Sequence, residues 1–259
     1  MELAIDRPAT DVAADGDARP LAGRRVAITG GTTGIGRAIA ITLARAGARI
    51  FICGRSQDHL DDALAAIGDV GQGDGIALDL ADPDNNVLFI DRAVAAMGGI
   101  DVAVFNAAIA AGALTDMDEA DLRRAIATDF TAYLLGAHAA AGVLGDDGAI
   151  VLIGSMSAHV LGPKSTVYAG IKYGIQGFAE ALRRELGPKG ISVSLVEPGK
   201  TGSNMQYPDI PDDKQREMIG KEEMLRAEDI AAGVLYLLVQ PRRVVVQQLT
   251  IVPRLSGGE

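Results

Sequence analysis

Short apolar runs rich in β-branched residues alternate along the chain with longer segments in which apolar residues recur at helical spacing. The runs predict strands at residues 25–29, 49–53, 75–80, 102–105, 149–153, 191–196 and 243–253. Strands that alternate with helices form βαβ units, whose right-handed crossovers give a parallel sheet covered on both faces. The predicted fold class is therefore α/β, with about seven strands in one doubly wound sheet.

The length of 259 residues, 48% of them apolar, and the mean hydropathy of +0.20 suit one large core. We expect one domain over residues 21–259, preceded by an extension at 1–20 that is rich in Asp and Ala. This extension is either mobile or a short arm packed on the surface. Residues 198–226 show no strong apolar periodicity, which is typical of a lid or a substrate-binding loop.

The net charge of −10 and the pI of about 4.8 argue against a nucleic acid or an anionic membrane as partner. No apolar run approaches the roughly 20 residues that span a bilayer, and the first residues lack the pattern of a signal peptide. The single cysteine, Cys53, and the three scattered histidines offer no metal-ligand spacing. We therefore expect a cytoplasmic protein with a small-molecule partner and no metal.

The first predicted strand runs into a glycine-rich turn, and a helical pattern follows to residue 47. Glycine lets the backbone approach a pyrophosphate closely, and the start of a helix offers unpaired N–H groups and a favourable dipole. The spacing is GxxxGxG, one step from the commonest dinucleotide fingerprint, although glycines also end strands and start helices for structural reasons alone. The predicted dinucleotide contacts of this turn are Gly30, Thr32, Thr33, Gly34, Ile35 and Gly36.

The end of the second strand bears on the choice of cofactor. A carboxylate there holds the ribose hydroxyls of NAD, whereas an arginine accommodates the 2′-phosphate of NADP. This chain has Gly54 followed by Arg55, which favours NADP(H) over NAD(H) unless Arg55 is only a solvated charge before the next helix. Asp79 and Leu80 end the third run, where Asp79 either faces the adenine or forms a turn.

Residues 153–173 pass from a strand through a loop into a helix and carry Ser155, Tyr168 and Lys172. Tyr168 and Lys172 are four apart and project from one helix face, where the lysine cation favours the ionised phenol. Tyr168 is then a candidate acid or base, and Ser155 a candidate hydrogen-bond donor to the reacting oxygen. From this segment alone, the alternative is a chance Tyr/Lys pair beside an ordinary loop serine.

The order of these motifs resembles the short-chain dehydrogenase/reductase family over residues 21–253. The family's TGxxxGxG, NNAG, serine, YxxxK and Pro-Gly motifs match residues 29–36, 106–109 (as a variant), 155, 168–172 and 198–199. The resemblance implies a Rossmann fold and hydride transfer between a nicotinamide and a carbonyl or carbinol carbon. It gives Ser155 the role of polarising the oxygen and Tyr168 that of giving or taking the proton. It also implies that Lys172 binds the nicotinamide ribose and lowers the pKa of the tyrosine.

On this basis we expect an NADP(H)-dependent enzyme, a homodimer or homotetramer, that interconverts a ketone and a secondary alcohol on a small or medium organic substrate. An NAD-dependent or non-redox member of the family, and a catalytically silent cofactor-binding protein, are the alternatives. Further cofactor contacts implied by the resemblance are Asn106, Ala107, Pro198, Gly199, Thr201 and Ser203. The residues expected near the substrate are Met156, His159, Val160, Leu161, Met205 and Tyr207.

One departure from the family's pattern falls in the helical region predicted at 118–142, where Asp129 replaces the usual asparagine. Asp129 either keeps a relay water on its backbone carbonyl or pairs with Lys172 and weakens the charge that activates Tyr168. The second interpretation predicts that Asp129→Asn raises turnover near neutral pH. His138, set among alanines in the same region, is expected to be a packed helix residue rather than a catalytic one.

Overall fold

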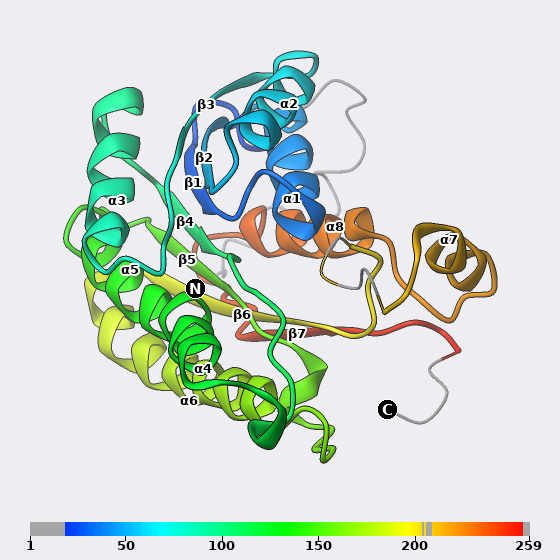
Figure 1. The fold of residues 1–259 in the computed structure, drawn as a ribbon. Coiled ribbons are helices and arrows are strands. Elements are labelled where there is room, and N and C mark those ends of the chain that lie inside the picture. The colour runs from blue at the N-terminus through cyan, green and yellow to red at the C-terminus, as the bar shows by residue number, and fades with distance from the viewer. Residues whose placement is uncertain (1–18, 204, 206–208, 256–259) are drawn as a thin grey trace, which may run out of the picture.

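The structure, a computed structural model, describes residues 19–203, 205 and 209–255 and is built on one seven-stranded sheet (Figure 1). The strands lie in the order β3-β2-β1-β4-β5-β6-β7, and all neighbouring strands are parallel. Their bounds are β1 Arg25–Thr29, β2 Arg49–Gly54, β3 Gln72–Ala77, β4 Val102–Phe105, β5 Ala149–Ile153, β6 Ser192–Pro198 and β7 Gln248–Ile251. The predicted α/β fold class is confirmed. The predicted extension at 1–20 lies outside the described residues except for its last two.

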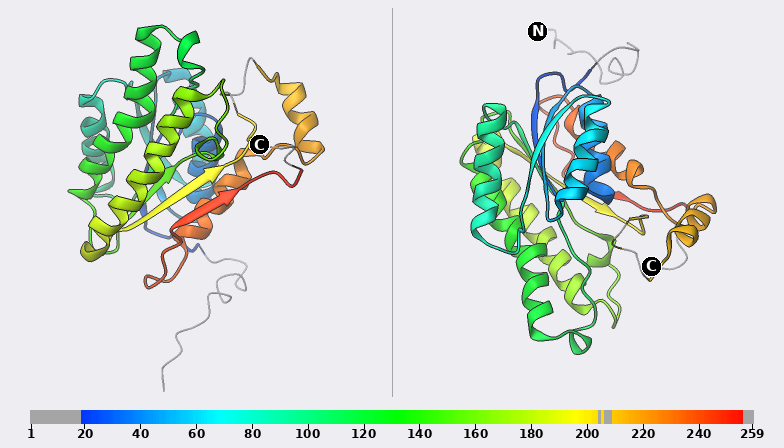
Figure 2. Two further views of the ribbon diagram at one scale, coloured as in Figure 1. Left: turned by 90° about the horizontal axis from the view of Figure 1, so that it is seen from below. Right: turned by 45° about the horizontal axis from the view of Figure 1, so that its top comes forward.

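Helices cover both faces of the sheet (Figures 1 and 2). α1, α2 and α8 pack on one face, and α3, α5 and α6 pack on the other. Side chains alternate along a strand, so in β1 Val26 and Ile28 enter one apolar layer while Ala27 enters the other. The helix bounds are α1 Gly34–Arg45, α2 Gln57–Gly68, α3 Asp84–Met97, α4 Glu119–Ile126, α5 Ala132–Ala141, α6 Thr166–Leu186, α7 Asp212–Gly220 and α8 Ala227–Leu238.

The strand order reverses direction at β1 and β4, which are neighbours in the sheet. In a doubly wound sheet the loops that leave such a pair of strands diverge, and ligands bind in the crevice at their carboxyl ends. The glycine turn follows β1, Asn106 follows β4, Ser155 follows β5 and Gly199 follows β6. The fold therefore brings the predicted motifs to one edge of the sheet.

Two strands begin three or more residues away from their predicted first residue. β3 covers Gln72–Ala77 rather than 75–80, because its pairing with β2 begins at polar and glycine residues that an apolar pattern misses. β7 covers Gln248–Ile251 rather than 243–253, because it is an edge strand that pairs only with the last residues of β6. In both cases pairing with the neighbouring strand sets the bounds.

The region predicted as helical at 118–142 is divided into three parts. α4 passes into a π-helical segment, Ala127–Thr131, which α5 then continues. π-helical turns inside α-helices are rare, but those that occur often lie at functional sites. This one carries Asp129. The expectation for His138 is wrong in one respect, because this residue of α5 is exposed rather than packed.

The segment at 198–226, predicted to be irregular, contains the helix α7. This helix has no apolar stripe that a periodicity reading would detect. Instead Glu217 forms ion pairs with Lys214 and Lys221, three residues before it and four after it. Figure 1 shows α7 standing apart from the sheet, beyond α1 and α8.

Candidate active site

Ser155, Tyr168 and Lys172 converge at the carboxyl end of β5. Ser155 caps a short 3₁₀ turn, Met156–Ala158, with its Oγ accepting a hydrogen bond from the Ser157 N–H at 3.1 Å. Tyr168 lies in the first turn of α6, and its phenol lies close to the Ser155 side chain. The structure therefore brings the predicted serine and tyrosine together.

Lys172, one turn further along α6, is only 2% exposed. Its Nζ donates to the carbonyl oxygen of Ile153 at 3.1 Å and lies 5.5 Å from the ring centroid of Tyr168 and 5.2 Å from that of Tyr133. Burial lowers the pKa of Lys172 to about 8, although attraction to Asp129 opposes this change. The two aromatic faces help to hold the buried cation beside the tyrosine.

The pKa of Tyr168 is raised above its usual value, first by burial and then by the negative charge of Asp129. The nearby Ser155 side chain lowers this pKa in part. In the protein alone Tyr168 therefore keeps its proton at neutral pH. Its phenol could act as an acid toward the oxygen of a bound substrate that Ser155 also contacts.

Asp129 is fully buried in the π-helical segment. Its Oδ1 accepts a hydrogen bond from the Ile109 N–H at 2.8 Å, while its Oδ2 is buried and has no partner among the described residues. Burial raises the pKa of Asp129 to about 6, against the attraction of Lys172 and the hydrogen bond from Ile109. The residue that departs from the family's pattern is thus half-satisfied and lies within electrostatic reach of Tyr168 and Lys172.

Two glycine positions in the turn after β1 leave no room for a side chain. Gly30 has φ +64°, and a Cβ on it would lie 2.8 Å from the Cα of Ala107. A Cβ on Gly36 would lie 2.1 Å from the Gly30 carbonyl oxygen. The Thr33 side chain at the start of α1 makes no capping hydrogen bond, and the first turn has no acidic residue. The turn and the helix start therefore fit the pyrophosphate of a dinucleotide.

Asn106 ties β4 to the glycine turn. Its side-chain Nδ2 donates to the carbonyl oxygens of Thr29 and Gly30 at 3.2 Å each, and its backbone N–H donates to Thr29 Oγ1 at 2.9 Å. This geometry gives Asn106 a role in shaping the cradle. Direct contact of Asn106 or Ala107 with a cofactor stays a prediction.

At the predicted ribose end, Arg55 is exposed just after β2. Asp79 accepts a hydrogen bond from the Ala81 N–H at 3.1 Å and forms an ion pair with Arg124 at 2.7 Å. Burial raises the pKa of Asp79, but the hydrogen bonds from Ala81 and Arg124 outweigh it and lower the pKa overall. Asp79 thus forms a turn, one of its two predicted roles, while Leu80 is buried in the apolar layer beneath α3 and α5.

A cavity of about 240 Å³ lies beside the glycine turn, toward α2. Inside the described part of the chain, the buried Arg37 Nε has no hydrogen-bond partner. A guanidinium and two threonine hydroxyls beside the turn suit a phosphate group. The lining residues are Thr32, Thr33, Gly34, Arg37, His59 and Asp62.

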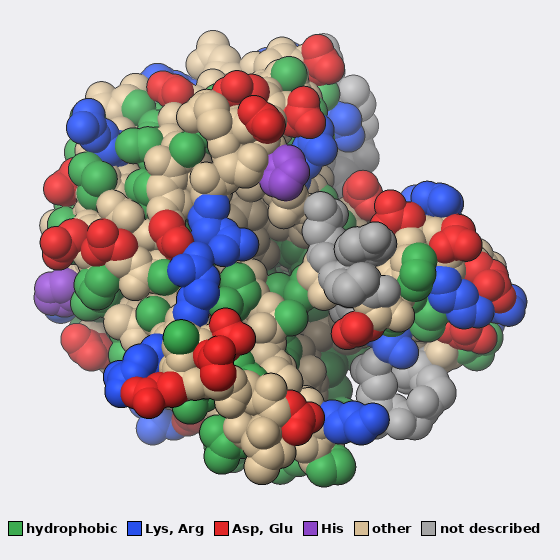
Figure 3. Space-filling view, in the orientation of Figure 1, with side chains coloured by type: hydrophobic (Ala, Val, Ile, Leu, Met, Phe, Trp, Pro, Cys, Tyr) green, Lys and Arg blue, Asp and Glu red, His purple; other side chains and the backbone are tan. Residues whose placement is uncertain are grey.

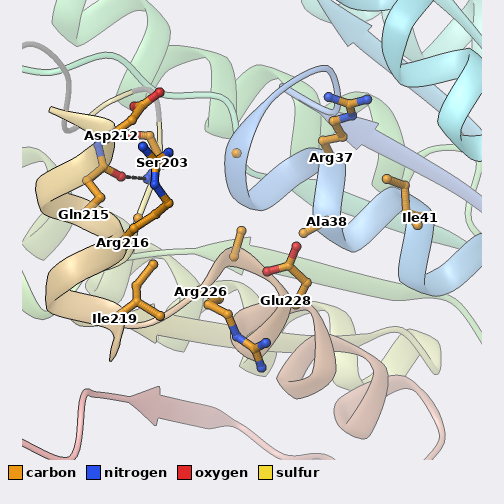
Figure 4. A pocket seen from close by; sticks show the side chains of 13 residues that line it. Arg37, Ala38, Ile41, Ser203, Asp212, Gln215, Arg216, Ile219, Arg226 and Glu228 are labelled. Carbon is orange, nitrogen blue, oxygen red and sulfur yellow. Dashed lines mark hydrogen bonds between the residues drawn. The ribbon is translucent and has the colours of Figure 1, made fainter. Parts of the chain in front are cut away.

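A second cavity, of about 450 Å³, lies between α1, α7 and the first residues of α8 (Figure 4). Figure 3 shows this side of the molecule hollowed between the main body and the α7 segment. Gln215 of α7 holds Ser203 in the wall, because its Oε1 accepts from the Ser203 N–H at 2.9 Å. Gly34 also lines this cavity, so Ser203 faces the glycine turn. Thr201, in contrast, is buried and donates to the Gly199 carbonyl oxygen.

The predicted substrate residues fall into two groups. Met156 and Val160 are partly buried on the loop after Ser155, whereas Leu161 is 74% exposed and Met205 is 39% exposed. His159 lies in the same loop and hydrogen-bonds a buried carboxylate, Glu197. Tyr207 lies outside the described residues.

Sequence reasoning missed two residues of this region, Tyr133 and Glu197. Tyr133 is buried, stacks beside Lys172 and donates to the Ile153 carbonyl oxygen at 3.1 Å. Its position four residues after Asp129 was a usable signal, since residues at that spacing share a helix face. Glu197 is the lone carboxylate in the apolar end of β6, directly before Pro198.

Among the described residues, no group of three or more His, Cys, Asp or Glu side chains is arranged to hold a metal ion. Within the same residues, no helix combines the length and the apolar character that crossing a bilayer requires.

The geometry agrees with the comparisons to known proteins. The sequence model of the short chain dehydrogenase family matches residues 24–214. This match covers most of the chain and includes the glycine turn and the Ser155, Tyr168 and Lys172 cluster. The chain belongs to the short-chain dehydrogenase/reductase family and is an oxidoreductase.

Individual relatives show how far the similarity extends. The chain is 35% identical to elsinochrome reductase 1 of Elsinoe fawcettii over 192 residues, 72% of each protein. It is 30% identical to the L-rhamnose 1-dehydrogenase (NADP(+)) of Thermoplasma acidophilum over 226 residues, which cover 83% of this chain and 89% of the relative. The fold is also similar to that in the crystal structure of a short chain dehydrogenase from Burkholderia cenocepacia J2315 in complex with NADP, with a TM-score of 0.81 and 33% sequence identity. The match covers 90% of this chain and 98% of that one.

Proposed function

We propose that this protein is an NADP(H)-dependent oxidoreductase that interconverts a ketone and a secondary alcohol on a small or medium organic substrate. The observation that carries the proposal is the cluster in which the Ser155 side chain lies beside the Tyr168 phenol and the buried Lys172 ammonium lies 5.5 Å from the tyrosine ring. The family resemblance also favours a homodimer or homotetramer, and light scattering on the purified protein measures its mass. We further propose that the protein is cytoplasmic.

In the direction of reduction, a bound nicotinamide would supply the hydride to the carbonyl carbon. Ser155 donates a hydrogen bond to the carbonyl oxygen and so orients it and stabilises its growing negative charge. Tyr168 gives its phenolic proton to the same oxygen, which completes the hydroxyl group. Lys172 stabilises the tyrosinate that remains, and proton uptake from solvent restores the phenol.

The replacement Tyr168→Phe tests this chemistry. It removes the proton donor and keeps the ring, so we expect turnover of a ketone panel to fall by at least about 100-fold. Binding of the nicotinamide cofactor, measured by fluorescence titration, should persist. The matched control is Tyr173→Phe, since Tyr173 is the next tyrosine on α6 and its side chain is exposed. Full activity in Tyr168→Phe would overturn the mechanism, whereas a wild-type protein that binds the cofactor but turns over no ketone would support a silent cofactor-binding protein.

Cofactor preference depends on Arg55. An exposed guanidinium at the end of β2 favours the 2′-phosphate of NADP(H), so wild-type protein should bind NADPH at least about tenfold more tightly than NADH. Arg55→Ala should remove most of this difference, whereas Arg45→Ala, at the exposed end of α1, should preserve it. Equal affinity for both nucleotides in the wild type, or a preference for NADH, contradicts the role given to Arg55.

A further inference from the structure

A buried carboxylate at the end of β6 has no part in the proton and hydride transfers above. Glu197 is 0% exposed, and its two carboxylate oxygens lie 2.9 and 3.0 Å from Nε2 of His159. From β7, Gln248 Nε2 and Thr250 Oγ1 also donate to it. Among the described residues no lysine or arginine forms an ion pair with Glu197. Burying a carboxylate is costly, so a position that served packing alone would favour an amide or an apolar side chain.

The carboxylate determines how the His159 ring presents itself. An ionised carboxylate only accepts hydrogen bonds, so the proton of the neutral imidazole is assigned to Nε2. Nδ1 then carries the free lone pair and acts as an acceptor. Within the described part of the chain nothing hydrogen-bonds Nδ1, and the His159 side chain is 35% exposed. Glu197 thus fixes one tautomer and leaves the opposite nitrogen available.

His159 also has a fixed position relative to the catalytic serine. It follows Ser155 by four residues, and its N–H donates to the Met156 carbonyl oxygen at 2.8 Å, which closes the 3₁₀ turn that Ser155 caps. The Glu197 side chain packs against Gly154, where an added Cβ would lie 3.3 Å from the Glu197 Cγ. The pair therefore joins the end of β6 to the loop that carries the reacting groups.

We propose that His159, oriented by Glu197, is a specificity-determining residue whose Nδ1 accepts a hydrogen bond from a substrate hydroxyl beside the reacting carbon. The substrate class is then the hydroxyketones and their vicinal diols. The inference rests on the proposed function, because it assigns the substrate of the same site. A site built to bond a hydroxyl discriminates strongly against the analogue that lacks it, since the acceptor is left unpaired.

A binding experiment tests this assignment. The ligands are 2-hydroxycyclohexanone and cyclohexanone, which differ by one hydroxyl group, titrated onto Tyr168→Phe protein loaded with NADPH and followed by nucleotide fluorescence. We expect the hydroxyketone to bind at least about tenfold more tightly. In Tyr168→Phe/His159→Phe the ratio of the two dissociation constants should fall to near one. The matched control adds His138→Phe, on the exposed face of α5, and should keep the parent ratio.

Equal affinities for the two ligands in the parent protein, or a ratio that survives His159→Phe, overturn the proposal. Glu197→Gln is the second variant, because it weakens the orientation of the ring while keeping the imidazole. It should lower the ratio in part, and an unchanged ratio would overturn the positioning role of Glu197. Since the Tyr168→Phe background is not required to turn over, the binding ratio is measured whether or not wild-type protein reduces ketones. The two proposals therefore fail separately.

Discussion

Asp129 and Glu197 are both fully buried carboxylates near the cluster of Ser155, Tyr168 and Lys172, but their surroundings are opposite. Glu197 has donors on both oxygens, from His159, Gln248 and Thr250. Asp129 has one donor, the Ile109 N–H, and a second oxygen without a partner among the described residues. The first site is built for a charge and the second tolerates one.

This difference separates two uses of a buried acid. A carboxylate surrounded by donors fixes the orientation of the groups around it. A half-satisfied carboxylate near a cation is balanced between its charged and neutral forms, and burial raises the pKa of Asp129 to about 6. We infer that Glu197 orients His159, while Asp129 adjusts the electrostatics of Tyr168 and Lys172.

The largest expected effect that separates the two sites is on stability. In Glu197→Gln an amide NH₂ group replaces one of the two accepting oxygens and faces His159 or Gln248, and the remaining hydrogen bonds no longer involve a charged acceptor. We expect the free energy of unfolding to fall by about 3 kcal/mol, measured by urea denaturation at neutral pH. Glu180→Gln, at an exposed ion pair on α6, is the control and should change it by less than about 0.5 kcal/mol. If Glu197→Gln is as stable as the wild type, the two buried carboxylates do not differ in what they contribute to stability.

The same replacement of a carboxylate by an amide at the other site, Asp129→Asn, should raise the free energy of unfolding. The folded chain raises the pKa of Asp129 from 3.8 to about 6, so it binds that proton more tightly than the unfolded chain does. The associated stability is present below about pH 4 and lost as the pH rises through about 6. Asparagine resembles the protonated carboxyl at every pH. We therefore expect Asp129→Asn to be more stable than wild type by about 2 kcal/mol at neutral pH.

Urea denaturation at several pH values checks this expectation. The pKa change already includes the attraction of Lys172. The gain at neutral pH is nevertheless less than the pKa change implies, because the asparagine amide N–H groups take the place of the buried, unpartnered Oδ2. The gap between variant and wild type should close as the pH approaches 4. A variant that is less stable than wild type at neutral pH would show that the charged form of Asp129 is needed by the fold.

The sequence predicted the parts of the site that depend on local geometry. The glycine turn lies between consecutive elements, and Tyr168 and Lys172 lie one helical turn apart, so their spacing alone places them together. The parallel sheet then brings the ends of β1, β4, β5 and β6 to one edge. These features follow from periodicity and connectivity, and the family resemblance agreed with them.

The contacts that distinguish this chain were beyond the sequence because they join distant residues. His159 and Glu197 are 38 positions apart and meet only because β5 pairs with β6 in one register. Asp129 was identified as unusual, but periodicity reveals neither its unpartnered oxygen nor the π-helical segment that carries it. The helix α7 has ion pairs of Glu217 with Lys214 and Lys221 and no apolar stripe that periodicity would detect.

The smallest expected effect concerns turnover in Asp129→Asn. During reduction Tyr168 gives up its proton, and the negative charge of Asp129 raises the energy of the tyrosinate that forms. Removing this charge should raise kcat for ketone reduction by about tenfold near neutral pH, equivalent to about 1.4 kcal/mol. The wild-type rate should approach that of the variant as the pH falls through about 6, because Asp129 then becomes neutral.

A pH–rate profile of kcat distinguishes this electrostatic role from a structural one. The pKa of Lys172 is held up by attraction to Asp129, so the loss of rate at alkaline pH should move to lower pH in the variant. A structural role of Asp129 changes the rate equally at all pH values and leaves the profile where it was. Parallel profiles, or unchanged kinetics, would mean that Asp129 does not weaken the activation of Tyr168, and that the difference between the two buried carboxylates is confined to stability.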